Sequence, residues 1–158
     1  MTRRLPPFVP RLLRPIVFVP LMLVPLMFVQ PVLCFGADPA QEVWDLLTQV
    51  ASALSERNPQ AFLAAFDPAM PGYQKMRAGV SALLRDAEVQ SSIELEADEG
   101  GAEERSVELD WLLKIRPEQD ATPSTRRQQR VKCRLRKSGK KWRIVWFEPL
   151  EFLAPPDK

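Results

Sequence analysis

The fold is decided by residues 130–147, which read RVKCRLRKSGKKWRIVWF. In the first half an apolar residue alternates with a basic one, which is the period of a strand that is buried on one face. A serine–glycine pair then turns the chain, and the alternation resumes at Trp142 and stops before Pro149. The stretch therefore predicts an antiparallel hairpin.

Two earlier segments, residues 89–96 and 106–115, have the same two-residue period. Acidic and glycine residues at 98–101 reverse the chain between them, so the four strands follow one another as an antiparallel meander. The alternation also predicts which side chains point to the covered face of this sheet. They are Val89, Ile93, Leu95, Val107, Leu109, Trp111, Leu113, Ile115, Val131, Cys133, Leu135, Trp142 and Ile144.

The segment before the strands has the apolar period of helices. Asp38-Pro39 and Asn58-Pro59 each place a capping side chain before a proline at the first helical position. They predict the starts of two helices, and a third helix is expected over residues 73–87. Because one face of the sheet must be covered and the helices are the available cover, we expect an α+β domain. In it, three N-terminal helices pack on a curved four-stranded antiparallel meander sheet.

Residues 1–37 differ from the rest of the chain, since they contain four arginines, no acidic residue and a long apolar run. A basic start, an apolar middle and small residues before a polar stretch are typical of a secretory signal peptide. We therefore expect an exported protein of the periplasm or cell envelope, with a domain over residues 38–153 and a short tail over 154–158. An uncleaved N-terminal anchor, which would be the one contact with a membrane, and a start codon assigned too far upstream stay open as alternatives.

The order of these elements resembles the nuclear transport factor 2-like superfamily, whose fold is a cystatin-like cone. The resemblance covers residues 38–153, and its most specific part is the glycine turn followed by Trp142 and Ile144. It implies a superfamily whose members include isomerase-like and dehydratase-like enzymes, binding domains and protein-interaction modules. Many members have a short strand between the second and third helices, whereas residues 67–72 are rich in proline and too few to form one.

The composition excludes several chemistries. The chain has no histidine, so it lacks the Ser–His and Cys–His nucleophile pairs and histidine metal ligands. Enzymes of the resembling superfamily hold acid or base groups inside the cone, but no carboxylate is among the residues expected there. We therefore expect no catalytic residue, no cofactor and no metal site, and interpret the domain as a non-catalytic binding or protein-interaction module. An isomerase-like or dehydratase-like enzyme that uses Tyr73 is the alternative.

Two sets of residues are candidates for ligand contacts. A pocket for a small apolar ligand would be lined by Tyr73, Trp111 and Trp142, although both tryptophans also suit a packed core. The other set is basic and lies on the outer face of the third strand: Arg130, Lys132, Arg134 and Arg136. These cations would bind an anionic surface, or else pair with acidic residues of the neighbouring strands in a charge ladder. Nucleic acid is not expected, since residues 38–158 have a net charge of −2 and the basic run lacks interleaved aromatic residues.

A third set is apolar and is expected on the outer face of the sheet. It consists of Leu112, Val145 and Phe147. Exposed apolar clusters usually mark interactions, so we expect either the tail from residue 150 to residue 156 or a second copy of the chain to cover it. The sequence does not identify the ligand or a protein partner.

Overall fold

The computed structural model describes residues 38–118 and 123–155. The predicted signal peptide or anchor, residues 1–37, lies outside the described residues, and so do residues 119–122 and 156–158. Within the described part of the chain, no helix has the length and apolar character needed to cross a membrane.

The three predicted helices are present. α1 (Pro39–Ser55) begins after Asp38, whose side chain accepts a hydrogen bond from the backbone N–H of Ala40. α2 (Pro59–Ala64) begins after Asn58, whose side chain caps the helix by the same means. In both cases an oxygen of the capping side chain satisfies a backbone N–H that has no partner within the helix. α3 spans Tyr73–Asp86.

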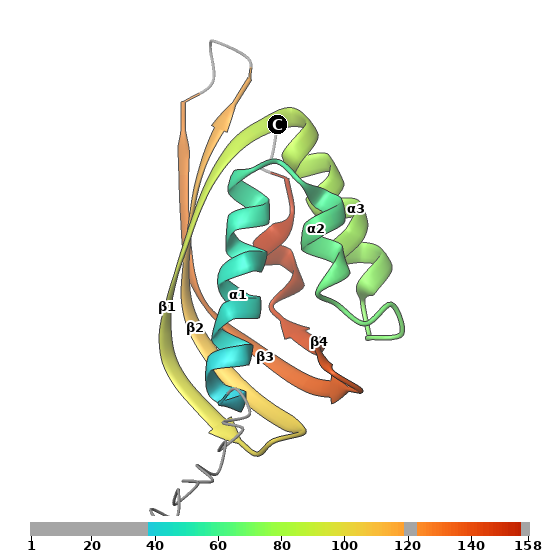
Figure 1. Cartoon of the computed structure of the whole chain (residues 1–158). Helices are drawn as coiled ribbons and strands as arrows, with labels where there is room; N and C mark the ends of the chain where they lie inside the picture. Colours follow the sequence, from blue (N-terminus) through green and yellow to red (C-terminus); the bar gives the residue numbers. More distant parts are fainter. Residues whose placement is uncertain (1–37, 119–122, 156–158) are drawn as a thin grey trace, which may run out of the picture. The chain divides into compact units, whose positions relative to one another are not determined.

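The four strands form one antiparallel sheet in the order β1-β2-β3-β4. Their bounds are β1 (Ala87–Gly100), β2 (Glu104–Pro117), β3 (Thr125–Ser138) and β4 (Lys141–Glu148). The sheet bends, and all helices lie on one side of it (Figure 1). This arrangement confirms the predicted α+β class, with helices covering one face of a curved meander.

Most of the residues that the alternation places on the covered face are buried there. The exceptions are Ile93, which is partly buried, and Leu95, which is 47% exposed. Leu95 pairs with buried Leu109 and so belongs to the expected face. It lies on an edge strand beside the start of α1 and just before a bulge, however, so neither helix nor neighbouring strand covers it. The prediction that Leu95 is a core residue is wrong.

A second correction concerns β4. The alternation places Trp146 on the covered face and Phe147 on the outer face, but Phe147 is only 3% exposed and belongs to the core. The pairing of β3 with β4 shifts between Arg134 and Leu135, so that Arg134 pairs with Trp146 while Leu135 pairs with Ile144. This bulge inserts one extra residue and reverses the facing of the side chains that follow.

The tail covers the helix side of the sheet rather than the outer face. A short 3₁₀ helix, η1 (Leu150–Leu153), buries Phe152 and Leu153. Arg127 of β3 fixes this segment, since its Nη1 donates hydrogen bonds to the carbonyl oxygens of Phe152 (2.6 Å) and Ala154 (2.8 Å). The prediction that the tail packs on an outer apolar cluster is therefore wrong.

The segment between α2 and α3 makes only one bridge to the sheet. Phe66 forms an isolated parallel bridge with Ile144, in which the Ile144 N–H donates to the Ala65 carbonyl and the Asp67 N–H donates to the Ile144 carbonyl. The bridge occupies the outer edge of β4 at Ile144.

Candidate functional site

The interior of the cone is an apolar core that contains a cluster of aromatic rings. The ring of Trp111 is fully buried and lies 6.1 Å from the ring of Phe147 and 5.7 Å from that of Phe152, measured between centroids. The indole Nε1 of Trp111 donates a hydrogen bond to Ser91 Oγ over 2.8 Å, so its polar atom is satisfied. No polar or charged side chain is buried anywhere in residues 38–118 and 123–155. The core of the described chain therefore consists of apolar side chains.

Cys133 is the ionisable side chain in the core of the described chain. Burial raises the pKa of its thiol to about 12, because the charged thiolate is unfavourable in an apolar environment. The nucleophilic form of cysteine is the thiolate, so Cys133 acts as a packing residue.

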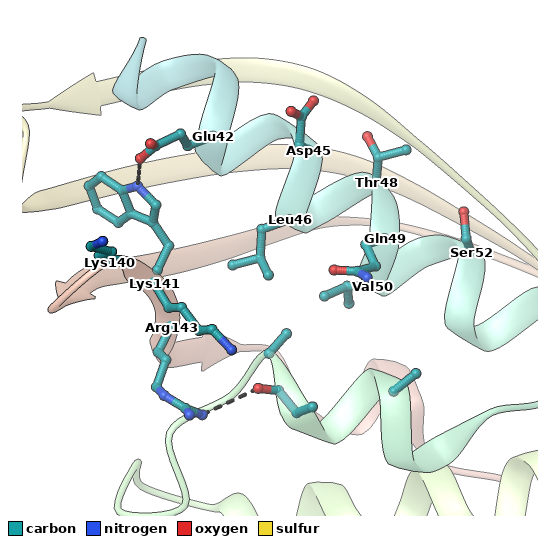
Figure 2. A pocket seen from close by; sticks show the side chains of 14 residues that line it. Glu42, Asp45, Leu46, Thr48, Gln49, Val50, Ser52, Lys140, Lys141 and Arg143 are labelled. Atoms are coloured by element: carbon teal, nitrogen blue, oxygen red, sulfur yellow. Dashed lines mark hydrogen bonds between the residues drawn. The ribbon is translucent and has the colours of Figure 1, made fainter. Parts of the chain in front are cut away.

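A groove of about 980 Å³ lies outside this core, between α1, α2 and the turn that joins β3 to β4 (Figure 2). Its apolar part is formed by Leu46 and Val50 of α1, Ala61 and Ala64 of α2, and Ala65 directly after α2. The three alanines have the i, i+3, i+4 spacing of one helix face. Because their side chains are small, the space between the two helices is left open.

Glu42 fixes the end of the groove where α1 meets the β3–β4 turn. Its Oε2 accepts a hydrogen bond from Trp142 Nε1 over 2.8 Å and another from Lys137 Nζ. The Lys137 ammonium also lies 5.6 Å from the centroid of the Trp142 ring. The hydrogen bond from Lys137, followed by that from Trp142, lowers the pKa of Glu42. Glu42 is therefore a carboxylate at neutral pH, and its hydrogen bond orients the Trp142 side chain that lines the groove. It is not suited to donate a proton.

Three cations on the same side of the groove are not neutralised. Lys140 and Lys141 form no ion pair with any described residue. Arg143 donates hydrogen bonds to the carbonyl oxygens of Ala64 (3.2 Å) and Phe66 (3.4 Å), but within the described chain it has no carboxylate partner. This end of the groove is consequently positive, whereas the charge of Glu42 is matched by Lys137.

The structure does not bring the predicted ligand residues together. Trp111 is enclosed in the core and cannot reach a ligand, and Tyr73 is half-buried at the start of α3, outside the groove. Trp142 alone lines the groove. The three-residue pocket is therefore a wrong prediction, because periodicity shows that a tryptophan faces inward but not how deeply helices cover it. Glu42 was missed because no local pattern links it to Trp142, which is 100 positions away.

The basic outer face of β3 forms ion pairs with its neighbours. Lys132 pairs with Glu108 of β2 at 2.9 Å, Arg136 pairs with Glu104 of β2 at 3.5 Å, and Arg130 pairs with Glu96 of β1. Arg134 lies over the ring of Trp146, 5.2 Å from its centroid. The face has the geometry of a charge ladder, so few of these cations are free for an anionic surface.

The three outer apolar residues do not form one patch. Phe147 is in the core, as described above, and β4 pairs only with residues 132–138 of β3. Leu112 pairs with Gln128 on β3 and Ser92 on β1, well away from β4. The predicted cluster is wrong because the strand register separates its members. A homodimer through this sheet face stays a prediction.

Comparison with known proteins agrees with the cone. No protein-family model matches the chain, and no curated protein matches it. Among solved structures, a conserved protein from Planctomyces limnophilus superposes with a TM-score of 0.62 at 10% identity, over 68% of this chain and 91% of its own. An NTF-2 like protein of unknown function from Shewanella oneidensis gives a TM-score of 0.59 at 13% identity, over 70% and 97% of the two chains.

The domain has the NTF2-like fold. A ketosteroid isomerase-like protein from Erwinia carotovora atroseptica has the same NTF2-like cone, with a TM-score of 0.58 at 12% identity over 71% of this chain and 95% of that protein. At such identities the likeness concerns the fold. Proteins with the NTF2-like fold therefore include some named after enzymes and others of unknown function.

Proposed function

We propose that this NTF2-like domain is a non-catalytic binding module, and that its ligand lies in the groove between α1, α2 and the β3–β4 turn. The observation that carries the proposal is the contrast between the filled interior of the cone and the open groove outside it. The cone interior, where isomerase-like enzymes do chemistry, is packed with buried apolar side chains, while a groove with an apolar part and charged borders opens at the surface. A concave apolar site with a few polar groups is the usual form of a small-molecule site.

The enzyme alternative requires a proton-handling group beside a bound substrate. In the described residues that line the groove, the best placed acid is Glu42, and it is already hydrogen-bonded to Lys137 and Trp142. Asp45 is also on the groove, and its Oδ1 accepts a hydrogen bond from Gln41 Nε2 over 2.7 Å. Asp45 is exposed, and the pKa of Glu42 is lowered by its hydrogen bonds from Lys137 and Trp142, whereas a general acid needs a raised one. The geometry supports binding better than catalysis.

The neutral fluorescent probe N-phenyl-1-naphthylamine tests whether the groove takes an apolar body. We expect its fluorescence to rise saturably with the wild-type protein. Ala64→Trp should abolish the rise, because the indole fills the space beside α2. Ala78→Trp, on the exposed side of α3, is the matched control and should bind like the wild type. Absence of binding to the wild type, or equal binding by Ala64→Trp, would refute the groove as the site.

We also propose that the domain is exported by residues 1–37, in line with their composition. A fusion of residues 1–45 to alkaline phosphatase, which is active only after export from a bacterial cytoplasm, tests this. Activity that disappears when four arginines are replaced by glutamate supports export. An inactive fusion with normal expression would contradict it.

A further inference from the structure

We infer that the groove selects an amphiphile with an anionic headgroup, whose head contacts Lys140, Lys141 and Arg143 and whose apolar chain follows α1 and α2. This inference rests on the proposed binding function and names the class of ligand. It starts from the uneven distribution of charge along the groove.

The positive charge is concentrated where the β3–β4 turn closes the groove. Lys140 and Lys141 are exposed and have no carboxylate partner in the described chain, and the guanidinium of Arg143 contacts only backbone carbonyl groups. The nearby charge of Glu42 is already matched by Lys137. Asp45 is the other carboxylate on the groove, and it belongs to α1 on the opposite side. The three cations therefore attract an anion to this end of the groove.

Away from the turn the groove offers apolar contacts together with uncharged polar ones. Along α1 the lining runs from Glu42 to Ser52 and includes Thr48 and Gln49, a length of about 15 Å at the helical rise. Leu46 points into this space in Figure 2, and Ala61, Ala64 and Ala65 also line it. No charged residue of α2 lines the groove. A linear alkyl chain suits the apolar part of this groove, because each buried methylene adds favourable transfer free energy.

An extended peptide is a poorer fit. Peptides that add a strand need free backbone groups at a sheet edge. At the groove, the edge of β4 is already used at Ile144, whose N–H and carbonyl bond to Ala65 and Asp67. The ligand must therefore be recognised by side chains and shape.

The headgroup is recognised mainly by its charge. Lysine ammonium groups are flexible point charges, whereas planar bidentate recognition requires a free edge of a guanidinium. Arg143 donates to the two carbonyl oxygens through Nη1 alone, so its Nε and Nη2 groups are left to contact a headgroup beside the two lysines. Carboxylate and phosphate heads both carry the negative charge that these three cations attract.

Displacement of N-phenyl-1-naphthylamine by four competitors tests the inference. The competitors are sodium dodecanoate, dodecyl phosphate, dodecyltrimethylammonium and acetate, each below its micelle concentration. We expect both anionic amphiphiles to displace the probe at least roughly tenfold more effectively than the cationic one. Acetate should not displace it, because it lacks the chain. The preference should shrink in 1 M salt, where charges are screened within about 3 Å.

The variant Lys140→Gln/Lys141→Gln should lose most of this preference while it still binds N-phenyl-1-naphthylamine. The matched control is Arg77→Gln/Lys114→Gln, which removes the same charge from two other exposed positions and should keep the preference. Equal displacement by anionic and cationic amphiphiles, or an equal loss in both double variants, would overturn the inference and leave the binding function standing. Failure of the probe itself to bind would instead refute the proposed function.

Discussion

Trp142 Nε1 donates a hydrogen bond to Glu42 Oε2 over 2.8 Å, and so joins the last strand of the sheet to the first turn of the first helix. Lys137 completes the contact from β3. The three side chains are drawn from α1, β3 and β4, and they define the closed end of the groove. The ionised carboxylate of Glu42 accepts both hydrogen bonds, so we expect its charge to stabilise the contact between α1 and the sheet.

The stability of the protein should depend on the ionisation of Glu42. Its pKa is lowered in the folded state from 4.5 by the hydrogen bonds from Lys137 and Trp142. A lowered pKa means that the ionised group stabilises the fold above pH 4.5 and that this contribution disappears as the pH falls through the folded-state pKa. We expect the melting temperature of Glu42→Gln to be lower than that of the wild type at pH 7 and the difference to shrink below pH 4.

Thermal unfolding followed by circular dichroism between pH 3 and pH 7 measures this difference. Glu99→Gln, at an exposed position of the β1–β2 hairpin, is the control and should melt with the wild type at pH 7. A Glu42→Gln melting temperature equal to that of the wild type at pH 7 would show that the contact does not stabilise the fold.

Trp111→Ala should destabilise the domain strongly. Its ring is fully buried between Phe147 and Phe152, and the truncation leaves a cavity in a close-packed core. Changes of this kind cost about 3–5 kcal/mol. Urea unfolding measures the free energy of unfolding. Trp44→Ala, which truncates a half-buried side chain, should lower this free energy by less than Trp111→Ala does. A loss as small as that of Trp44→Ala would place Trp111 outside the core.

The bulge between β3 and β4 predicts opposite outcomes for two adjacent substitutions. Phe147→Glu places a charge in the core and should prevent folding, whereas Trp146→Glu alters an outer position beside Arg134 and should leave a folded domain. Far-ultraviolet circular dichroism and one-dimensional proton spectra distinguish the two. A folded Phe147→Glu together with an unfolded Trp146→Glu would match unbroken alternation and contradict the bulge.

Local patterns were sufficient to predict the elements. The Asp38-Pro39 and Asn58-Pro59 caps mark helix starts because their effect is confined to one turn. The alternation around Trp111 marks the covered face because it persists over a whole strand. The burial of Leu95 was predicted wrongly because no helix or neighbouring strand covers it, and that of Phe147 because a bulge reverses its facing. Neither cause is visible in the local sequence pattern.

The groove could not be predicted from the sequence. Its walls come from α1, α2 and the β3–β4 turn, and their separation depends on how the helices dock on the sheet. The contact between Glu42 and Trp142 has the same origin. The basic run on β3 was visible in the sequence, but Arg130, Lys132 and Arg136 pair with carboxylates of β1 and β2. The cations without a carboxylate partner on the groove are Lys140, Lys141 and Arg143.

The central claim is that a ligand binds in the outer groove while the cone interior stays closed. The indole N–H resonances of Trp142 and Trp111, assigned with Trp→Phe variants, test it directly in a ¹⁵N-labelled protein titrated with dodecanoate. We predict a saturable shift of the Trp142 resonance and no shift of the Trp111 resonance. A shift of Trp111 with Trp142 unmoved would show that the ligand enters the cone and would contradict the account.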